Sequence, residues 1–295
     1  MMMKKLNIGN LSISVPIVQG GMGVGISLSG LASAVANEGG VGVISSAGLG
    51  LLYRNLSKDY IQASIMGLKE ELRKAREKTK GVIGVNVMVA MSNFADMVKT
   101  AIAEKADIIF SGAGLPLNLP SFLQKDSVTK LVPIVSSARA ARVIAEKWHN
   151  LYNYLPDAFV VEGPKAGGHL GFKDEQINDE HFSLEHILPE VIDEVKDIET
   201  HYGKSIPVIV AGGIYTGEDI KRFMDMGAAG VQMGTRFVTT EECDASDIFK
   251  QTYIEAKQED IQIIKSPVGM PGRAIFSKFI QKVKEGQKQP KTCMC

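Results

Sequence analysis

The chain of 295 residues is poor in cysteine and histidine, and it has no excess charge of either sign. It contains three cysteines and five histidines, and 33 basic residues balance 33 acidic ones. So few cysteines in a chain of this length exclude a disulfide scaffold. Nucleic-acid-binding proteins usually carry a basic excess, so the charge balance favours small acidic or neutral ligands and predicts no nucleic-acid partner.

The sequence also lacks long apolar runs. No stretch of about 18 apolar residues is present, so no membrane span is expected. The first residues contain two lysines but no unbroken apolar region with a cleavage site, so no signal peptide is expected. Together with the scarcity of cysteine, these absences favour a cytoplasmic protein in a reducing environment.

Metal-binding motifs are scarce as well. Cys293 and Cys295 form a C-x-C pair at the end of the chain, but no second ligand pair accompanies them. Metal or redox use and an exposed, frayed terminus are both compatible with this pair. No H-x-x-H or paired-carboxylate motif is present, so no metal site is predicted.

Short apolar, β-branched runs recur along the chain, and each ends in glycine, serine or another polar residue. Continuous apolar runs are typical of parallel strands buried on both faces. Eight such runs begin at Val15, Val41, Val82, Asp107, Val132, Ala158, Ile206 and Ala229.

Helical patterns lie between these runs, with Ser29 and Ser57 as the expected N-caps of two helices. Most runs follow one another after about 25 residues, which is the length that one βα unit requires. Eight β-then-α units predict an α/β fold that closes into a TIM (β/α)₈ barrel, with an open doubly wound sheet as the alternative.

Three further segments are expected around a barrel of residues 1–244. The charged residues 170–205 follow the sixth strand and are predicted to form an insertion or lid. Residues 245–284 are predicted to form a helical cap on the substrate side of the barrel. Residues 285–295 are expected to be a flexible tail.

Two glycine-containing segments follow the seventh and eighth runs, VAGGIYTGEDI at 210–220 and VQMGTRF at 231–237. In barrels these two loops frequently bind phosphate through backbone N–H groups. Either segment alone is compatible with an ordinary βα turn, but the two together predict a phosphate site. Thr216 has the position of a helix cap.

A third glycine-rich segment, GGMGVGIS, spans residues 20–27. Its spacing is G-x-G-x-G rather than the G-x-G-x-x-G of dinucleotide-binding loops, and no acidic strand end follows about 20 residues later. A loop whose backbone closely approaches a flat ligand is the preferred interpretation, and a tight turn is the alternative.

The sixth run continues into EGPKAGGHLGF, residues 162–172, which contains Glu162, Lys165 and His169. Histidine transfers protons near neutral pH, although an isolated histidine is more often structural. The place of His169 at the end of a barrel strand, where active sites form, favours a catalytic role. No cysteine occurs in the strand-end loops before Gly234, which disfavours covalent thiolate chemistry.

Five segments together, QGGMG, GVNVMV, EGPKAGGHLG, VIVAGGI and QMGTRF, resemble the nitronate monooxygenase family and the related flavin enoyl-acyl-carrier-protein reductases. The resemblance runs from about residue 7 to residue 275. It implies a TIM barrel that binds FMN noncovalently and has His169 as its catalytic histidine. The residues expected to bind FMN are Gly20, Gly21, Met22, Asn86, Glu162, Gly167, Gly168, Gly212, Gly213, Gln232, Met233, Gly234 and Thr235.

The resemblance implies a flavin-dependent oxidoreductase that oxidises alkyl nitronates with O2 to a carbonyl compound and nitrite. The alternative is an NAD(P)H-dependent enoyl-acyl-carrier-protein reductase, because Glu162 stands where many nitronate monooxygenases have glutamine. The segment SPVGMPGRAI is closer to bacterial proteins grouped with the monooxygenases. The expected partners are an alkyl nitronate or enoyl thioester with O2 or NAD(P)H, and a second copy of the chain in a homodimer.

Overall fold

The computed structural model describes residues 4–266 and 269–288 and contains a closed barrel of eight parallel strands. The strands pair in the order β10-β11-β3-β4-β5-β6-β7-β8. All eight predicted runs form these strands, so the TIM-barrel prediction is confirmed. Their bounds are β3 Ile17–Gln19, β4 Val41–Ser45, β5 Val82–Met88, β6 Ile108–Gly112, β7 Lys130–Val135, β8 Phe159–Glu162, β10 Val208–Ala211 and β11 Gly230–Met233.

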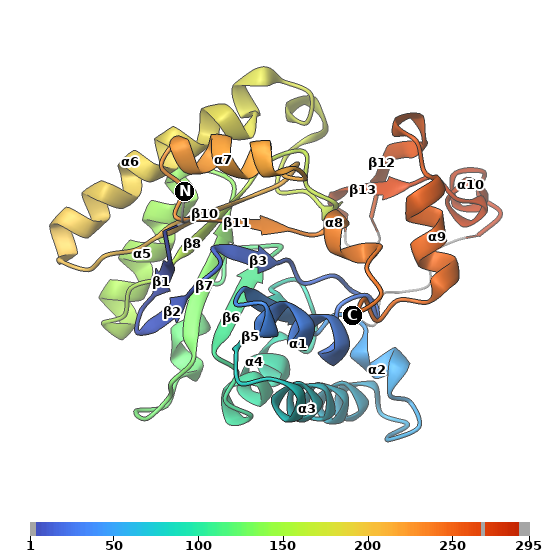
Figure 1. Ribbon diagram of the computed structural model, residues 1–295, viewed down its shortest axis with the longest axis horizontal. Coiled ribbons are helices and arrows are strands. Elements are labelled where there is room, and N and C mark those ends of the chain that lie inside the picture. The colour runs from blue at the N-terminus through green and yellow to red at the C-terminus, as the bar shows by residue number, and fades with distance from the viewer. Residues whose placement is uncertain (1–3, 267–268, 289–295) are drawn as a thin grey trace.

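Helices follow the strands and cover the outside of the barrel (Figure 1). The strands are buried on both faces, by the barrel interior and by these helices, which explains why their sequences are continuously apolar. The helices are α1 Ser29–Asn37, α2 Leu49–Leu52, α3 Tyr60–Lys78, α4 Phe94–Ala103, α5 Ala138–Tyr152, α6 Leu184–Tyr202, α7 Gly217–Asp225 and α8 Thr235–Val238, with a 3₁₀ helix, η1, at Leu119–Phe122.

An N-terminal hairpin, which the sequence analysis did not predict, closes one end of the barrel. Its strands are β1 Leu6–Ile8 and β2 Leu11–Ile13. Leu6, Ile8 and Ile13 are at most 2% exposed and pack into the inner core cluster with side chains from the barrel strands. The turn at Gly9 approaches Lys130, the first residue of β7, so the hairpin covers the N-terminal ends of the strands.

Two of the predicted N-caps are wrong. Ser29 is the first residue of α1, and the carboxylate of Asp244 accepts the N–H groups of Leu28, Gly30 and Leu31 at 2.7–3.1 Å. Asp59, not Ser57, caps α3 by accepting the N–H of Gln62 at 2.8 Å. A cap needs only an oxygen near the free N–H groups, and a distant residue can supply it.

The long segment after the sixth strand contains an ordinary barrel helix. The 19 residues of α6 account for about half of residues 170–205, and they pack against β8 and β10. The additional residues therefore lie between β8 and α6. They contain β9 Gly168–His169 and two 3₁₀ helices, η2 Asp174–Gln176 and η3 Glu180–Phe182.

The predicted cap region is only partly helical. It contains α9 Asp247–Glu255, η4 Gln258–Asp260 and α10 Lys278–Lys284, and between them an unpredicted hairpin of β12 Ile261–Lys265 and β13 Pro271–Ile275. These orange-to-red elements lie beside α8, on the side toward which β11 points (Figure 1). Most of the predicted flexible tail, with Cys293 and Cys295, lies outside the described residues.

Strand β13 also pairs antiparallel with β9, so the C-terminal hairpin and the residues around His169 form one three-stranded sheet. Segments about 100 residues apart in the chain are thereby joined next to the barrel. None of the helices in the described ranges is long and apolar enough to cross a membrane.

Candidate functional site

Three predicted side chains point into the barrel at the C-terminal ends of the strands, here called the mouth. Glu162 and Gln232 both lie opposite Ala211, which belongs to the inner core cluster. Asn86 lies opposite Phe110, another member of that cluster. Because partners in register face the same side of a sheet, all three polar side chains lie above the apolar interior.

The loop after β3 crosses the mouth close to Asn86. The N–H of Gly20 donates to the carbonyl of Met233 at 2.8 Å, which joins this loop to the end of β11. A Cβ on Gly21 would lie 2.3 Å from Cβ of Asn86, so only glycine permits this approach. The N–H of Met22 donates to Oγ of Ser27 at 2.8 Å, which closes the loop on itself.

Glu162 is the last residue of β8 and is half-buried. Burial raises the pKa of its carboxyl group to about 7, and no neighbouring charge contributes to the shift. Both the neutral acid and the carboxylate are therefore populated near neutral pH. The neutral acid can donate a hydrogen bond, as a glutamine amide would at any pH.

The loops after β8 and β10 touch each other through glycines. Gly212 has φ +98°, and a Cβ there would lie 2.8 Å from the carbonyl oxygen of Gly163. A Cβ on Gly213 would lie 2.9 Å from Cβ of Lys165. These two glycines are therefore required by the close approach of neighbouring loops, whether or not a ligand is bound.

His169 lies in β9, in the loop of residues 163–172, here called the His169 loop. Its side chain is half-buried, and burial lowers the pKa of the imidazole. Within the described part of the chain, neither ring nitrogen has a hydrogen-bond partner. Gly167 and Gly168 are exposed, and a Cβ on either would meet no atom within 4 Å. The backbone next to His169 is thus open to solvent, and the neutral imidazole has no protein hydrogen-bond partner in the described ranges.

The loops after β10 and β11 provide free backbone donors. The N–H groups of Gly213, Gly234 and Thr235 donate to no protein acceptor in residues 4–266 and 269–288. A phosphate could accept from such groups. The side chain of Met233, by contrast, packs in the outer core cluster at 5% exposure, so only its backbone can face a ligand at the mouth.

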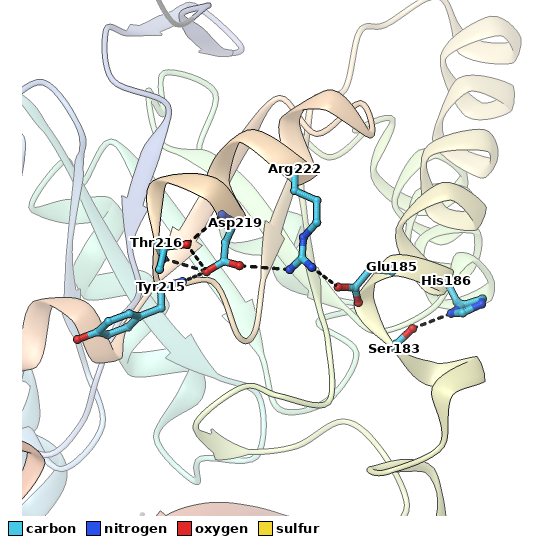
Figure 2. A network of polar contacts seen from close by, with 7 residues as sticks. All are labelled: Ser183, Glu185, His186, Tyr215, Thr216, Asp219 and Arg222. Carbon is cyan, nitrogen blue, oxygen red and sulfur yellow. Dashed lines mark hydrogen bonds and ion pairs between the residues drawn. The ribbon is translucent and has the colours of Figure 1, made fainter. Parts of the chain in front are cut away.

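A polar network fixes the start of α7 and was only partly predicted (Figure 2). Thr216 caps the helix as expected, since its Oγ1 accepts the N–H of Asp219 at 3.1 Å. The carboxylate of Asp219 accepts the N–H groups of Tyr215 and Thr216 at 3.1 and 2.9 Å. Those two donors are therefore already used, and Gly213 is left for a phosphate.

The same network continues to α6. Arg222 forms ion pairs with Asp219 at 3.3 Å and with Glu185 at 3.2 Å (Figure 2). Glu185 is in the first turn of α6, so the phosphate-type loop is connected to the helix that follows the His169 loop. The backbone hydrogen bonds to Asp219 lower the pKa of its carboxyl group.

Two cavities flank the mouth. One of about 400 Å³ adjoins the loops after β10 and β11 and is lined by residues that include Thr216, Met233 and Arg236. Another of about 590 Å³ lies between η2 and the C-terminal hairpin, against Asp174, Ile264 and Pro271. Neither cavity is lined by Asn86, Glu162 or His169.

The residues present fit a flat, phosphate-bearing cofactor. In the loop after β3, Gly20 and Gly21 have no side chains that would block a flat ring system. Polar side chains point from the barrel interior toward the mouth. The free N–H groups follow β11, which is next to β3, and β10, which is next to β11. A metal centre has no comparable support: no group of three or more His, Cys, Asp or Glu residues in the described ranges could hold an ion.

Arg273 is the residue of this region that sequence reasoning missed. It lies in β13, and its guanidinium donates to the carbonyl oxygens of Ala166 and Pro164 at 3.2 and 3.0 Å. The segment SPVGMPGRAI contains it, but proline and two glycines mask the strand pattern. Nothing local in the sequence indicates that this segment pairs with the His169 loop.

Comparison with known proteins gives consistent matches. The family model for nitronate monooxygenase matches residues 4–294. A curated relative from Mycobacterium tuberculosis, (3aS,4S,5R,7aS)-5-hydroxy-7a-methyl-1-oxo-octahydro-1H-indene-4-carboxyl-CoA dehydrogenase, is 30% identical over 94% of this chain and 68% of its own length. A probable nitronate monooxygenase from Staphylococcus saprophyticus is 26% identical over 94% of this chain and 80% of its own length.

Among solved structures, FabK from Thermotoga maritima is similar, with a TM-score of 0.73 and 28% sequence identity. The match covers 93% of this chain and 75% of that chain.

Proposed function

This chain belongs to the nitronate monooxygenase family, and on that premise we propose that it is an FMN-dependent oxidoreductase that converts alkyl nitronates and O2 to a carbonyl compound and nitrite. His169 is the observation that carries the proposal. Its half-buried imidazole lies in β9, in the loop that follows barrel strand β8, and within the described ranges neither ring nitrogen has a hydrogen-bond partner. Such a group is available to a substrate.

The proposed FMN site uses residues from five strands. The backbone of Gly20 and Gly21 would approach the ring system, and Asn86, Glu162 and Gln232 would face it from the barrel interior. Gly213, Gly234 and Thr235 would donate backbone N–H groups to the phosphate. When bound, FMN supplies the electron-transfer chemistry, and the protein supplies position and electrostatics.

His169 has two proposed tasks, depending on the substrate. Burial lowers the pKa of His169, so the neutral imidazole is the main form at pH 7. The neutral ring can remove the proton next to the nitro group of a neutral nitroalkane. For a nitronate, which is already an anion, the ring N–H can donate to the negatively charged group. General-base catalysis of this kind contributes about 10²–10⁴-fold in rate.

Replacement of His169 tests the assignment. We expect His169→Ala to retain stoichiometric FMN, measured by its absorbance, and to lose activity on a neutral nitroalkane by about 10²–10⁴-fold. His201→Ala is the matched control, because His201 is exposed at the end of α6 remote from the mouth. Full activity of His169→Ala on the neutral nitroalkane would exclude His169 as the base.

Glu162 favours a second candidate, reduction of an enoyl thioester by NAD(P)H. An acid with a pKa of about 7 can donate a hydrogen bond where many nitronate monooxygenases have glutamine. A relative that acts on a CoA thioester and the similarity to FabK support this candidate. In that reaction the N–H of His169 would donate to the thioester carbonyl.

One pair of assays separates the candidates. The purified protein is mixed without oxygen with NADH or NADPH, and the flavin absorbance is followed. Rapid bleaching, then recovery on addition of crotonyl thioester, supports the reductase. Oxygen consumption with propyl nitronate and no oxidation of NAD(P)H supports the monooxygenase.

A further inference from the structure

Arg273 contacts the His169 loop from the C-terminal hairpin. Its Nε donates to the carbonyl oxygen of Ala166 at 3.2 Å and its Nη2 to that of Pro164 at 3.0 Å. Beside these contacts, Gly272 pairs with His169 and Arg273 with Gly168 in the β13–β9 ladder. The N–H of Leu170 donates to the carbonyl of Pro271 at 2.9 Å. All five contacts join the hairpin to the same loop.

The charge of Arg273 has no acidic partner in the part of the chain that the structure describes. The side chain is half-buried, and burial alone lowers the pKa of the guanidinium. A buried cation is destabilising unless its N–H groups are hydrogen-bonded. The carbonyl oxygens of Pro164 and Ala166 fulfil that requirement, so the loop and the guanidinium stabilise each other.

The His169 loop has little packing at the two residues directly before the histidine. Gly167 and Gly168 have no side chains, and no atom lies within 4 Å of a Cβ built on either. Lys165, between the two bonded carbonyls, is exposed. Ala166 is buried in the core and its N–H donates to the carbonyl of Gly163 at 3.1 Å, which anchors the start of the loop. Beyond Ala166, the contacts with β13 are the ones that hold residues 167–169.

Arg273 and His169 lie on opposite faces of the three-stranded sheet. His169 is in register with Gly272, whereas Arg273 is the next residue along β13 and is in register with Gly168. Successive residues of a strand point to opposite faces. Arg273 therefore reaches the loop backbone from the side opposite the imidazole, and it can influence His169 only through that backbone.

We propose that Arg273 is a positioning residue, which fixes the backbone of residues 164–169 and thereby the place of the His169 imidazole over the mouth. The inference rests on the proposed function insofar as it concerns catalysis by His169. The contacts themselves predict a structural effect that can be measured without any substrate.

The test compares hydrogen–deuterium exchange in the FMN-loaded wild type, Arg273→Met, Arg273→Lys and Lys278→Met. We expect exchange in residues 163–172 to be about tenfold faster in Arg273→Met, equivalent to about 1.4 kcal/mol. Arg273→Lys retains a cation with N–H donors and should restore part of the protection. Lys278 is exposed at the start of α10, so Lys278→Met is the control for loss of one positive charge.

Exchange in residues 82–88 of β5 serves as the internal reference and should be the same in all four proteins. Unchanged exchange of residues 163–172 in Arg273→Met, or an equal increase in Lys278→Met, would overturn the proposal. Should the methionine variant be unstable, Arg273→Lys is compared with wild type, and exchange of residues 163–172 that is no faster than in wild type would overturn the proposal.

A double-mutant cycle then tests the connection to His169. We expect Arg273→Met to lower kcat about tenfold on whichever substrate is turned over, with FMN content unchanged. In the His169→Ala background the same change should have no further effect on kcat, because Arg273 acts through His169. A further loss there would mean that Arg273 acts on the substrate or cofactor itself. Altered exchange with full activity of His169→Ala would instead reject the proposed function of His169.

Discussion

The two ends of the barrel differ in almost every physical respect. At the N-terminal end, Leu6, Ile8 and Ile13 pack against apolar strand residues and are at most 2% exposed. At the mouth, Glu162 and His169 have no partner for their polar groups within the described ranges. One end consists of buried apolar contacts, whereas the other includes polar side chains that have no hydrogen-bond partner in the described ranges.

Because of this difference, we expect the closed end to contribute mainly to stability and the mouth mainly to ligand binding and catalysis. Apolar burial without cavities stabilises a fold, whereas a buried polar group without a partner destabilises it. A ligand bound at the mouth, as proposed above, would satisfy such groups. Substitutions at the two ends should therefore affect different measurements, and three variants test this comparison.

The largest effect is expected at the closed end. Ile8→Ala should lower the free energy of unfolding by roughly 2–5 kcal/mol, because a fully buried isoleucine is replaced by a cavity between the hairpin and the barrel. Chemical denaturation measures the change. The FMN content and the activity per folded molecule should stay close to the wild type, since the mouth is at the other end of the strands.

Ile248→Ala is the matched control, because Ile248 is 83% exposed on α9 and its truncation should change stability by less than about 0.5 kcal/mol. If Ile8→Ala abolished FMN binding at a temperature where the protein is folded, the two ends would be coupled and the comparison would fail.

A smaller and pH-dependent effect is expected at the mouth. Burial raises the pKa of Glu162 from 4.5 to about 7 in the folded protein. An acid whose pKa is raised on folding does not change stability at pH values below its pKa in the unfolded chain. As pH rises from that pKa to the pKa in the folded protein, the group destabilises the fold progressively. Relative to wild type, Glu162→Gln should therefore gain stability between pH 4.5 and pH 7, up to roughly 3 kcal/mol.

The measurement is denaturation at pH 5 and pH 8, without added substrate. Part of the Glu162 side chain is accessible to solvent, which limits the gain. Glu190→Gln, an exposed residue of α6, should show the same stability as wild type at both pH values. A gain by Glu162→Gln that is equal at both pH values would exclude ionisation of Glu162 as its cause.

The sequence predicts those parts of the molecule whose pattern lies within a single short segment of the chain. Each of the eight barrel strands is a continuous apolar run, and the burial that produces this pattern is the same in every strand of a closed parallel barrel. The N-terminal hairpin also had a local signal that was missed. Leu6, Ile8, Leu11 and Ile13 flank a Gly9–Asn10 turn, which is typical of a short hairpin.

Contacts between distant segments could not be predicted in this way. Asp244 caps α1 across more than 200 residues, and any of several acidic residues could have had that role on sequence grounds. The pairing of His169 with Gly272 involves a strand of two residues, which is too short for a periodic pattern. The side chains of the candidate site are predicted from motifs, but the backbone contacts that position them are visible only in the fold.

The smallest effect is expected in the polar network at the start of α7. Its groups lie at the mouth, but they already have hydrogen-bond partners. Asp219 accepts two backbone N–H groups and the Thr216 hydroxyl, and these bonds lower the pKa of Asp219. A carboxyl group with a lowered pKa stabilises the fold above its unfolded pKa, and this stabilisation is lost as pH falls through the folded value. Asp219→Asn should therefore cost about 1 kcal/mol at pH 7 and less in acid.

Denaturation at pH 7 and near pH 3 measures this change, and Glu218→Gln is the control because Glu218 is an exposed acid in the same helical turn. Because the Asp219 carboxylate fixes the backbone of Tyr215 and Thr216 beside the loop that contains Gly213, Asp219→Asn should also weaken FMN binding by a few-fold at most. A loss of FMN larger than that of Glu162→Gln would mean that the α7 network, and not the unpartnered groups of the mouth, determines cofactor affinity.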